Sequence, residues 1–118
     1  MEIHFYGLPD CTTCRKAKRR LDYHRVALTK FRDIKEEPLD RAEIERLARS
    51  VGGAENLFSR RSNKYRELGL KDKTLSETEM LDLMANEYTF LKRPILVAGD
   101  LTITGFFEKE YDEFFRGK

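Results

Sequence analysis

Two cysteines, Cys11 and Cys14, stand where a strand-like segment gives way to a helical one, and the 118-residue chain has no others. Residues 2–6 alternate polar and apolar side chains, which predicts a β-strand. Residues 12–24 contain neither Gly nor Pro and space their apolar residues as a helix does. Any fold for this sequence must therefore place a cysteine at a helix N-terminus, where the helix dipole favours a thiolate.

The rest of the chain predicts three more strands and several helices. Strands are expected over residues 27–32, 95–97 and 101–104, and helices over 38–51, in short pieces within 56–70, from 77 to about 84, and over 107–115. Ser76 and Glu79 form a capping box that starts the third of these helical segments. The order β-α-β, helices, β-β-α is that of a thioredoxin-like domain spanning residues 1–118, with a helical insertion at about 38–91.

The composition excludes several classes of function. The chain carries 23 basic and 21 acidic residues, a net charge of +2, which is too balanced for a dedicated nucleic-acid-binding protein. Its first residues lack the apolar core of a signal peptide, and no apolar run approaches the roughly 20 residues of a membrane helix. We therefore expect a cytoplasmic protein with no membrane contact and no direct nucleic-acid binding. In that compartment a disulfide is catalytic or sensing more often than structural.

Three kinds of chemistry fit the cysteine pair. The thiols could be redox-active, they could be structural bystanders, or they could be half of a zinc site that needs two more ligands. His4 and His24 are the only nitrogen ligands of that type, one in the first strand and one at the far end of the helix. We favour redox chemistry with no metal and no bound cofactor. Cys11 is then the expected nucleophile, and Cys14, one turn later on the apolar face, the resolving thiol.

Two basic segments leave their roles open. The run from Arg15 to Arg20 fits a solvated helix face, which we favour, or a patch for an acidic partner. Arg60 and Arg61 interrupt a helical stretch and fit an anion site or surface ion pairs equally well. Charge alone does not choose between these alternatives, because it does not say which side chains the fold brings together.

Several motifs resemble the ArsC/Spx family, which contains glutaredoxin-coupled arsenate reductases and the Spx redox-sensing transcription regulators. The resemblance covers nearly the whole chain. Cys11, Thr13 and Arg15 match the Cys-x-Thr-Ser-Arg stretch of the reductases, with Cys14 at the serine position. Further matches are the Arg61-Ser62 pair of the regulators, the reductase-like segment 65–70, the Arg-Pro strand start within residues 91–97 and the Gly-Phe turn at residues 104–106.

The resemblance implies an α/β, thioredoxin-like fold with a four-stranded mixed sheet and an inserted helical segment. It also implies a cis peptide bond between Arg93 and Pro94, with the proline facing the active cysteine. The reductases hold their oxyanion with three arginines. Arg93 matches one of these and Arg61 or Arg60 another, whereas the third position falls near the uncharged Gly105.

The function implied is that of a thiol-dependent oxidoreductase related to the arsenate reductases, with arsenate itself not assigned. Glutathione is the co-substrate that the resemblance implies, and glutathione with glutaredoxin, or thioredoxin, the reductant. The alternative is an Spx-like sensor that binds the α subunit of RNA polymerase. The expected site residues are Cys11, Cys14 and Arg93 for catalysis, and Thr13, Arg15, Arg60, Arg61 and Pro94 for binding a substrate or anion.

Overall fold

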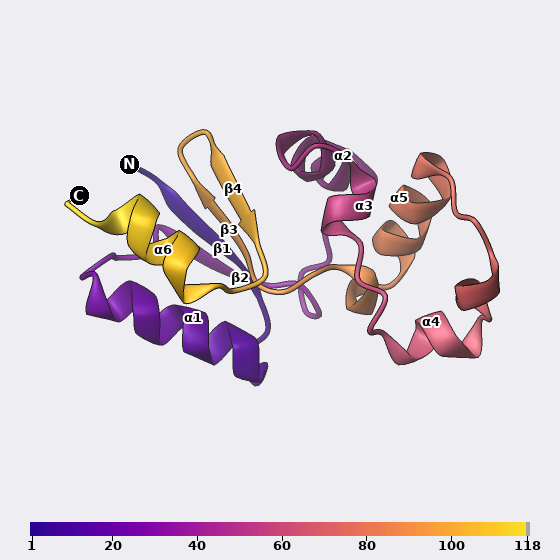
Figure 1. Cartoon of the computed structure of the whole chain (residues 1–118), viewed down its shortest axis with the longest axis horizontal. Coiled ribbons are helices and arrows are strands. Elements are labelled where there is room, and N and C mark those ends of the chain that lie inside the picture. Colours follow the sequence, from indigo (N-terminus) through magenta and orange to yellow (C-terminus); the bar gives the residue numbers. More distant parts are fainter. Residues whose placement is uncertain (118) are drawn as a thin grey trace. The chain divides into compact units, whose positions relative to one another are not determined.

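The computed structural model describes residues 1–117, which fall into two compact units. One unit contains Met1–Ile34 and the segment from Arg93 to the C-terminus, and the other contains Lys35–Lys92. The first holds a β-sheet with helices α1 and α6, and the second holds the remaining helices (Figure 1). The helical insertion expected at about residues 38–91 corresponds to this second unit.

The sheet has four strands in the order β2-β1-β3-β4. Their bounds are β1 Ile3–Gly7, β2 Lys30–Asp33, β3 Ile95–Ala98 and β4 Leu101–Thr104. Strand β2 runs parallel to β1, while β3 is antiparallel to both β1 and β4, so the predicted mixed sheet is confirmed. The predicted start of the second strand at residue 27 was wrong. The β1–β2 ladder begins at the pair His4–Lys30, so residues 27 and 28 have no strand beside them.

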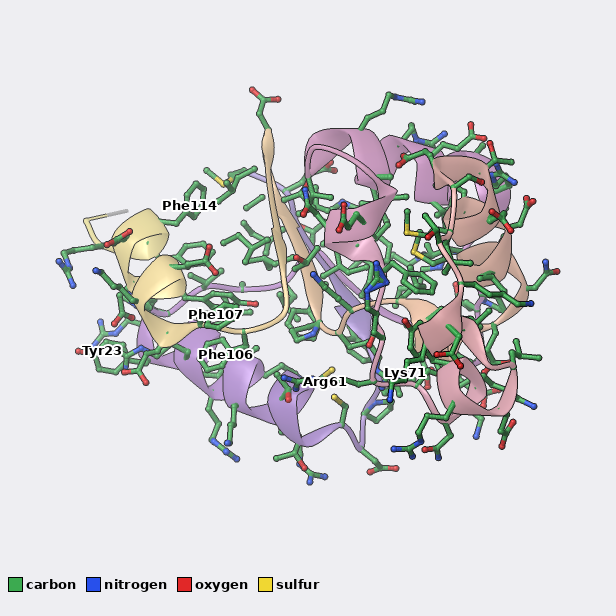
Figure 2. The ribbon with its side chains drawn as sticks, turned by 45° about the vertical axis from the view of Figure 1, so that its right-hand side comes forward. Tyr23, Arg61, Lys71, Phe106, Phe107 and Phe114 are labelled. Atoms are coloured by element: carbon green, nitrogen blue, oxygen red, sulfur yellow. The ribbon has the colours of Figure 1, made fainter. Side chains whose placement is uncertain are left out.

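Helices α1 (Thr12–Tyr23) and α6 (Glu108–Phe115) lie side by side against the sheet (Figure 1). Apolar side chains from both helices and from β1, β3 and β4 form one core, made of Ile3, Phe5, Cys14, Ala17, Leu21, Leu96, Ala98, Ile103, Tyr111 and Phe115. Burial of each large apolar side chain contributes about 1.5–3 kcal/mol. Phe106 and Phe114 border this core, whereas Phe107 is 65% exposed (Figure 2). The core thus fixes α1, and with it the cysteine pair, onto the strands.

A charged cluster joins α1 to α6. The guanidinium of Arg20 donates two hydrogen bonds to the carboxylate of Asp112, at 2.6 and 2.8 Å, and Nε2 of His24 lies 2.7 Å from the same carboxylate. Arg20 also lies over the ring of Tyr23 at 4.0 Å and 3.4 Å from Glu108. The hydrogen bonds from Arg20 and His24 lower the pKa of Asp112 to about 2. Arg20, part of the basic run, is therefore a structural residue that joins the two helices.

Asp112 should make the stability of the protein sensitive to acid. Its folded-state pKa is below the unfolded value of 3.8, so its contribution is present above about pH 4 and is lost as the pH falls toward 2. We expect Asp112→Asn to lower the melting temperature at neutral pH, and the difference from wild type to shrink as the pH is lowered. Thermal denaturation monitored by circular dichroism across this range would check this, and a constant difference would contradict it.

The second unit begins with α2 (Arg41–Ser50), which is capped by Asp40 in a capping box with Glu43. Pro38, the predicted first residue of this helix, lies outside it, because the side chain of Asp40 supplies the N-terminal cap. The capping box of Ser76 and Glu79 is confirmed at the start of α5. The other elements are α3 Ala54–Leu57, α4 Asn63–Glu67, the 3-10 helix Leu70–Asp72, α5 Glu77–Asn86 and the 3-10 helix Tyr88–Phe90.

Candidate functional site

Cys11 is the N-cap of α1. Its backbone is extended (φ −79°, ψ 123°), and its Sγ accepts a hydrogen bond from the backbone N–H of Cys14 at 3.4 Å. Its carbonyl accepts the first helical hydrogen bond, from the N–H of Arg15 at 2.9 Å. A sulfur therefore occupies the place where an oxygen of Ser, Thr, Asp or Asn usually caps a helix. This arrangement directs free N–H groups and the positive end of the helix dipole at the thiol.

The surroundings of Cys11 favour its thiolate. Partial burial of the sulfur would by itself raise its pKa, but the hydrogen bonds outweigh this effect. The thiol and backbone N–H of Cys14, the positive charge of Arg93 and a hydrogen bond to the backbone of Thr13 together lower the pKa of Cys11 below 9.0. Of the expected charges, Arg93 is the one that acts on this sulfur, whereas the exposed Arg15 contacts Cys11 through its backbone. Cys11 is accordingly the more acidic and the more exposed of the two thiols.

Cys14 has the opposite environment. It is 1% exposed and lies in the core between α1 and the sheet. Burial raises its pKa to about 12, and the hydrogen bond and negative charge of Cys11 act in the same direction. A Cβ atom built on Gly7 would lie 2.8 Å from its Sγ, so the thiol packs directly on the backbone of β1. The two thiols are free and differ strongly in acidity, which is the asymmetry expected of a nucleophile and a resolving partner.

The peptide bond between Arg93 and Pro94 is cis, as predicted from the family resemblance. Pro94 is buried at the start of β3, and its carbonyl accepts a hydrogen bond from the N–H of Gly105 at 2.7 Å. Gly105 has a φ of 74°, a backbone conformation that favours glycine over residues with a side chain. The turn that follows β4 therefore helps to hold the segment that carries Arg93.

The remaining predicted residues fall in different places. Thr13 and Arg15 are exposed at the start of α1, beside the cysteine pair. Arg60 and Arg61 belong to the other unit, on the exposed segment between α3 and α4. Arg61 is labelled in Figure 2. The guanidinium of Arg60 lies 5.5 Å from the ring centroid of Phe58 in that same unit. Their part in binding an anion stays a prediction.

Two residues near the cysteines were not predicted as site residues. Gly7 was assigned only to a turn, although its lack of a side chain makes room for the thiol of Cys14. Tyr111 was assigned to the apolar side of α6, and its hydroxyl is buried without a hydrogen-bond partner among the described residues. Burial first, and then the charge of Cys14, raise the pKa of Tyr111. For Gly7, the only signal in the sequence was a glycine at the turn that leads to the cysteines. Nothing in the sequence indicated a position of Tyr111 near the cysteines.

Neither a metal site nor a membrane span was found in the part of the chain that the structure describes. Within residues 1–117, no group of three or more His, Cys, Asp or Glu side chains is placed to hold a metal ion. The helices of the same residues are too short or too polar to cross a bilayer.

Comparison with known proteins places this geometry in a family. The sequence pattern of the ArsC family matches residues 6–114. The uncharacterised protein YusI of Bacillus subtilis is 36% identical over 116 residues, which cover 96% of this chain and 98% of YusI. The global transcriptional regulator Spx of Streptococcus pneumoniae is 33% identical over 113 residues, covering 95% of this chain and 84% of Spx.

A solved structure agrees with these relatives. The structure of a possible arsenate reductase from Streptococcus mutans superposes with a TM-score of 0.74 at 34% sequence identity, covering 88% of this chain and 90% of that one. The shared fold is α/β and thioredoxin-like, with a four-stranded mixed sheet and a helical insertion. Relatives of this chain thus carry both enzyme and regulator names. With its Cys-x-x-Cys pair at the start of α1, the chain belongs to the ArsC family.

Proposed function

We propose that this protein is a thiol–disulfide redox protein in which Cys11 is the nucleophile and Cys14 the resolving thiol. The Cys11 thiolate attacks one sulfur of a disulfide substrate, forms a mixed disulfide and releases one thiolate. Cys14 then gives up its proton and attacks Sγ of Cys11, which releases the second thiolate and leaves a Cys11–Cys14 disulfide. The substrate gains two electrons and the cysteine pair loses two. Glutathione with glutaredoxin, or thioredoxin, would return the pair to the dithiol.

One observation carries this proposal: the sulfur of Cys11 is itself the cap of α1 and accepts the N–H of Cys14. A cap needs only an acceptor, which Ser, Thr, Asp or Asn supplies better, whereas a nucleophilic cysteine gains a lowered pKa from this position. The charge of Arg93 and the thiol of Cys14 add to the same effect. Closure of a disulfide between residues three apart would restrict only a very short loop, so stabilisation does not explain the pair.

A second function rests on the similarity to Spx, a transcriptional regulator. In that case the same cysteine pair would act as a sensor, and the redox state would alter binding to a partner such as the α subunit of RNA polymerase. The two functions differ in turnover. An enzyme reduces many equivalents of substrate, whereas a sensor changes its binding once per oxidation and shows negligible turnover.

Cysteine variants should separate the two thiols. On treatment with a small disulfide, we expect wild type to form an intramolecular disulfide, Cys14→Ser to stop as a mixed disulfide on Cys11, and Cys11→Ser to lose at least about nine-tenths of the reaction rate, because the remaining thiol is buried and protonated. Mass spectrometry of the intact protein distinguishes the three products.

Turnover with glutathione and glutaredoxin, or with thioredoxin, then decides between enzyme and sensor. Multiple turnovers that depend on Cys11 support an oxidoreductase. A reversible disulfide without turnover supports a sensor, and a pull-down of RNA polymerase in both redox states becomes the next measurement. If wild type forms no Cys11–Cys14 disulfide under any oxidant, both functions are excluded.

A further inference from the structure

A groove of about 390 Å³ lies beside the cysteine pair, between α1, β2 and the turn that joins β1 to α1. Leu8, Pro9 and Phe31 are its apolar lining residues, and Cys14 also contributes to the lining. Leu8 and Pro9 belong to the turn that leads into Cys11, whose N–H lies 3.4 Å from the carbonyl of Leu8. The groove therefore reaches the turn that leads into Cys11, and Cys14 is the cysteine among its lining residues. Its volume is in the range of small-molecule binding sites.

Three cations edge this groove. Arg15, Lys18 and Arg19 line it, against a single carboxylate, that of Asp22. Among residues 1–117, none of the three cations has an ion-pair partner within 4.0 Å. Lys18 instead holds its Nζ 5.7 Å from the ring centroid of Phe31. The three cations and Asp22 thus give the groove a net charge of +2 beside its apolar lining residues.

We infer that this groove binds the carboxylate-bearing part of an acidic disulfide substrate, so that the site selects disulfides of negative charge. This inference rests on the proposed thiol–disulfide function. In this arrangement the cations attract the carboxylates, and the apolar side chains of Leu8, Pro9 and Phe31 accept the aliphatic part. The substrate sulfur would then lie at the turn that leads into Cys11. Cys11 attacks that sulfur, and each half of the substrate leaves as a thiol while the cysteine pair becomes a disulfide.

The basic run of the sequence therefore divides by helix face. Residues 15, 18, 19 and 22 recur at the spacing of one face of α1, toward β2, whereas Arg20 pairs with Asp112 on the side toward α6. Lys16 is one turn before Arg20, is exposed, and does not line the groove. It has the same charge and lies on the same helix as Lys18, which makes it a matched control.

The test compares three small disulfides of different charge on the reduced full-length protein: glutathione disulfide, which is negative, hydroxyethyl disulfide, which is neutral, and cystamine, which is positive. Formation of the Cys11–Cys14 disulfide is followed by rapid mixing and acid quench. For Lys18→Glu and Arg19→Glu we expect the rate with glutathione disulfide to fall on the order of 3- to 10-fold at low salt, the rate with hydroxyethyl disulfide to stay the same and the rate with cystamine to rise. Lys16→Glu should leave all three rates unchanged.

The outcomes separate this inference from the function on which it rests. If wild type and both groove variants react with glutathione disulfide at equal rates, and the Cys11–Cys14 disulfide still forms, the groove inference is overturned and the proposed function is not. An equal loss of rate in Lys16→Glu also overturns it, because attraction to the overall charge of the protein would then explain the effect. No disulfide with any of the three probes overturns both. Lys18→Gln, with half the charge change, should give an intermediate rate. A second acidic probe, a mixed disulfide between a Glu-rich peptide and glutathione, is compared with glutathione disulfide. The groove variants should reduce the rate most for the substrate that fits the groove better, which shows whether that substrate is a peptide or a small molecule.

Discussion

At pH 7, iodoacetamide is expected to alkylate Cys11 at least about 30-fold faster than Cys14. A thiol with a pKa of about 12 is ionised in only ~10⁻⁵ of molecules at this pH, whereas one below 9.0 is ionised in more than ~10⁻². The ratio of thiolates is therefore at least ~10³. The more basic thiolate, that of Cys14, is the stronger nucleophile, and its higher intrinsic reactivity reduces the expected ratio of rates by a factor of roughly 15–30. Burial of Cys14 then works further against its reaction.

Initial rates from peptide mapping by mass spectrometry would check this ratio. The variants Cys14→Ser and Cys11→Ser give the rate of each thiol alone, which removes any effect of the first alkylation on the second. Arg93→Gln should slow the reaction of Cys11, because it removes the charge that lowers the pKa of this thiol. The rate of Cys11 should also rise with pH through a midpoint below 9.0. Alkylation of both cysteines at similar rates would contradict the assignment of nucleophile and resolving thiol.

The position of the cysteine pair in the fold was predictable because it depends on local rules. Apolar residues recur every two positions before Cys11, which indicates a strand, and about every 3.6 positions after it, which indicates a helix. The turn between these segments leaves one cysteine at the start of the helix. The capping box at Ser76 and the hairpin of β3 and β4 follow from equally local signals. The cis bond at Pro94 came from family resemblance, and no local pattern in the sequence indicated it.

What could not be predicted depends on contacts between distant residues. The start of β2 depends on where β1 offers a partner, which no property of residues 27–29 reveals. The groove needs Lys18 and Phe31 together, and these are brought into contact only when β2 pairs beside α1. Arg20 looks in the sequence like its basic neighbours, yet its bond to Asp112 crosses 92 positions of the chain. Such pairings are consequences of the fold and leave no mark in local sequence.

Gly7→Ala is expected to lower the free energy of unfolding by about 1–2 kcal/mol and to slow the closure of the Cys11–Cys14 disulfide. Gly7 is not among the glycines with positive φ, so backbone conformation alone would permit alanine. The added Cβ would lie 2.8 Å from Sγ of Cys14 and 3.3 Å from the ring of Phe5, and both of these residues are buried in the core. Either the thiol must change its position, away from the geometry that faces Cys11, or α1 must move from the sheet.

A double-mutant cycle isolates the contact with the thiol. If the clash with Sγ causes the loss, Gly7→Ala should cost less in a Cys14→Ala background than in wild type, with a coupling of about 0.5–2 kcal/mol measured by urea denaturation of the reduced proteins. An equal cost in both backgrounds would instead assign the effect to Phe5 or to the strand itself. The added methyl group would alter both stability and disulfide closure. A coupling energy between Gly7→Ala and Cys14→Ala, together with slower closure of the Cys11–Cys14 disulfide, would place Gly7 among the residues that position Cys14.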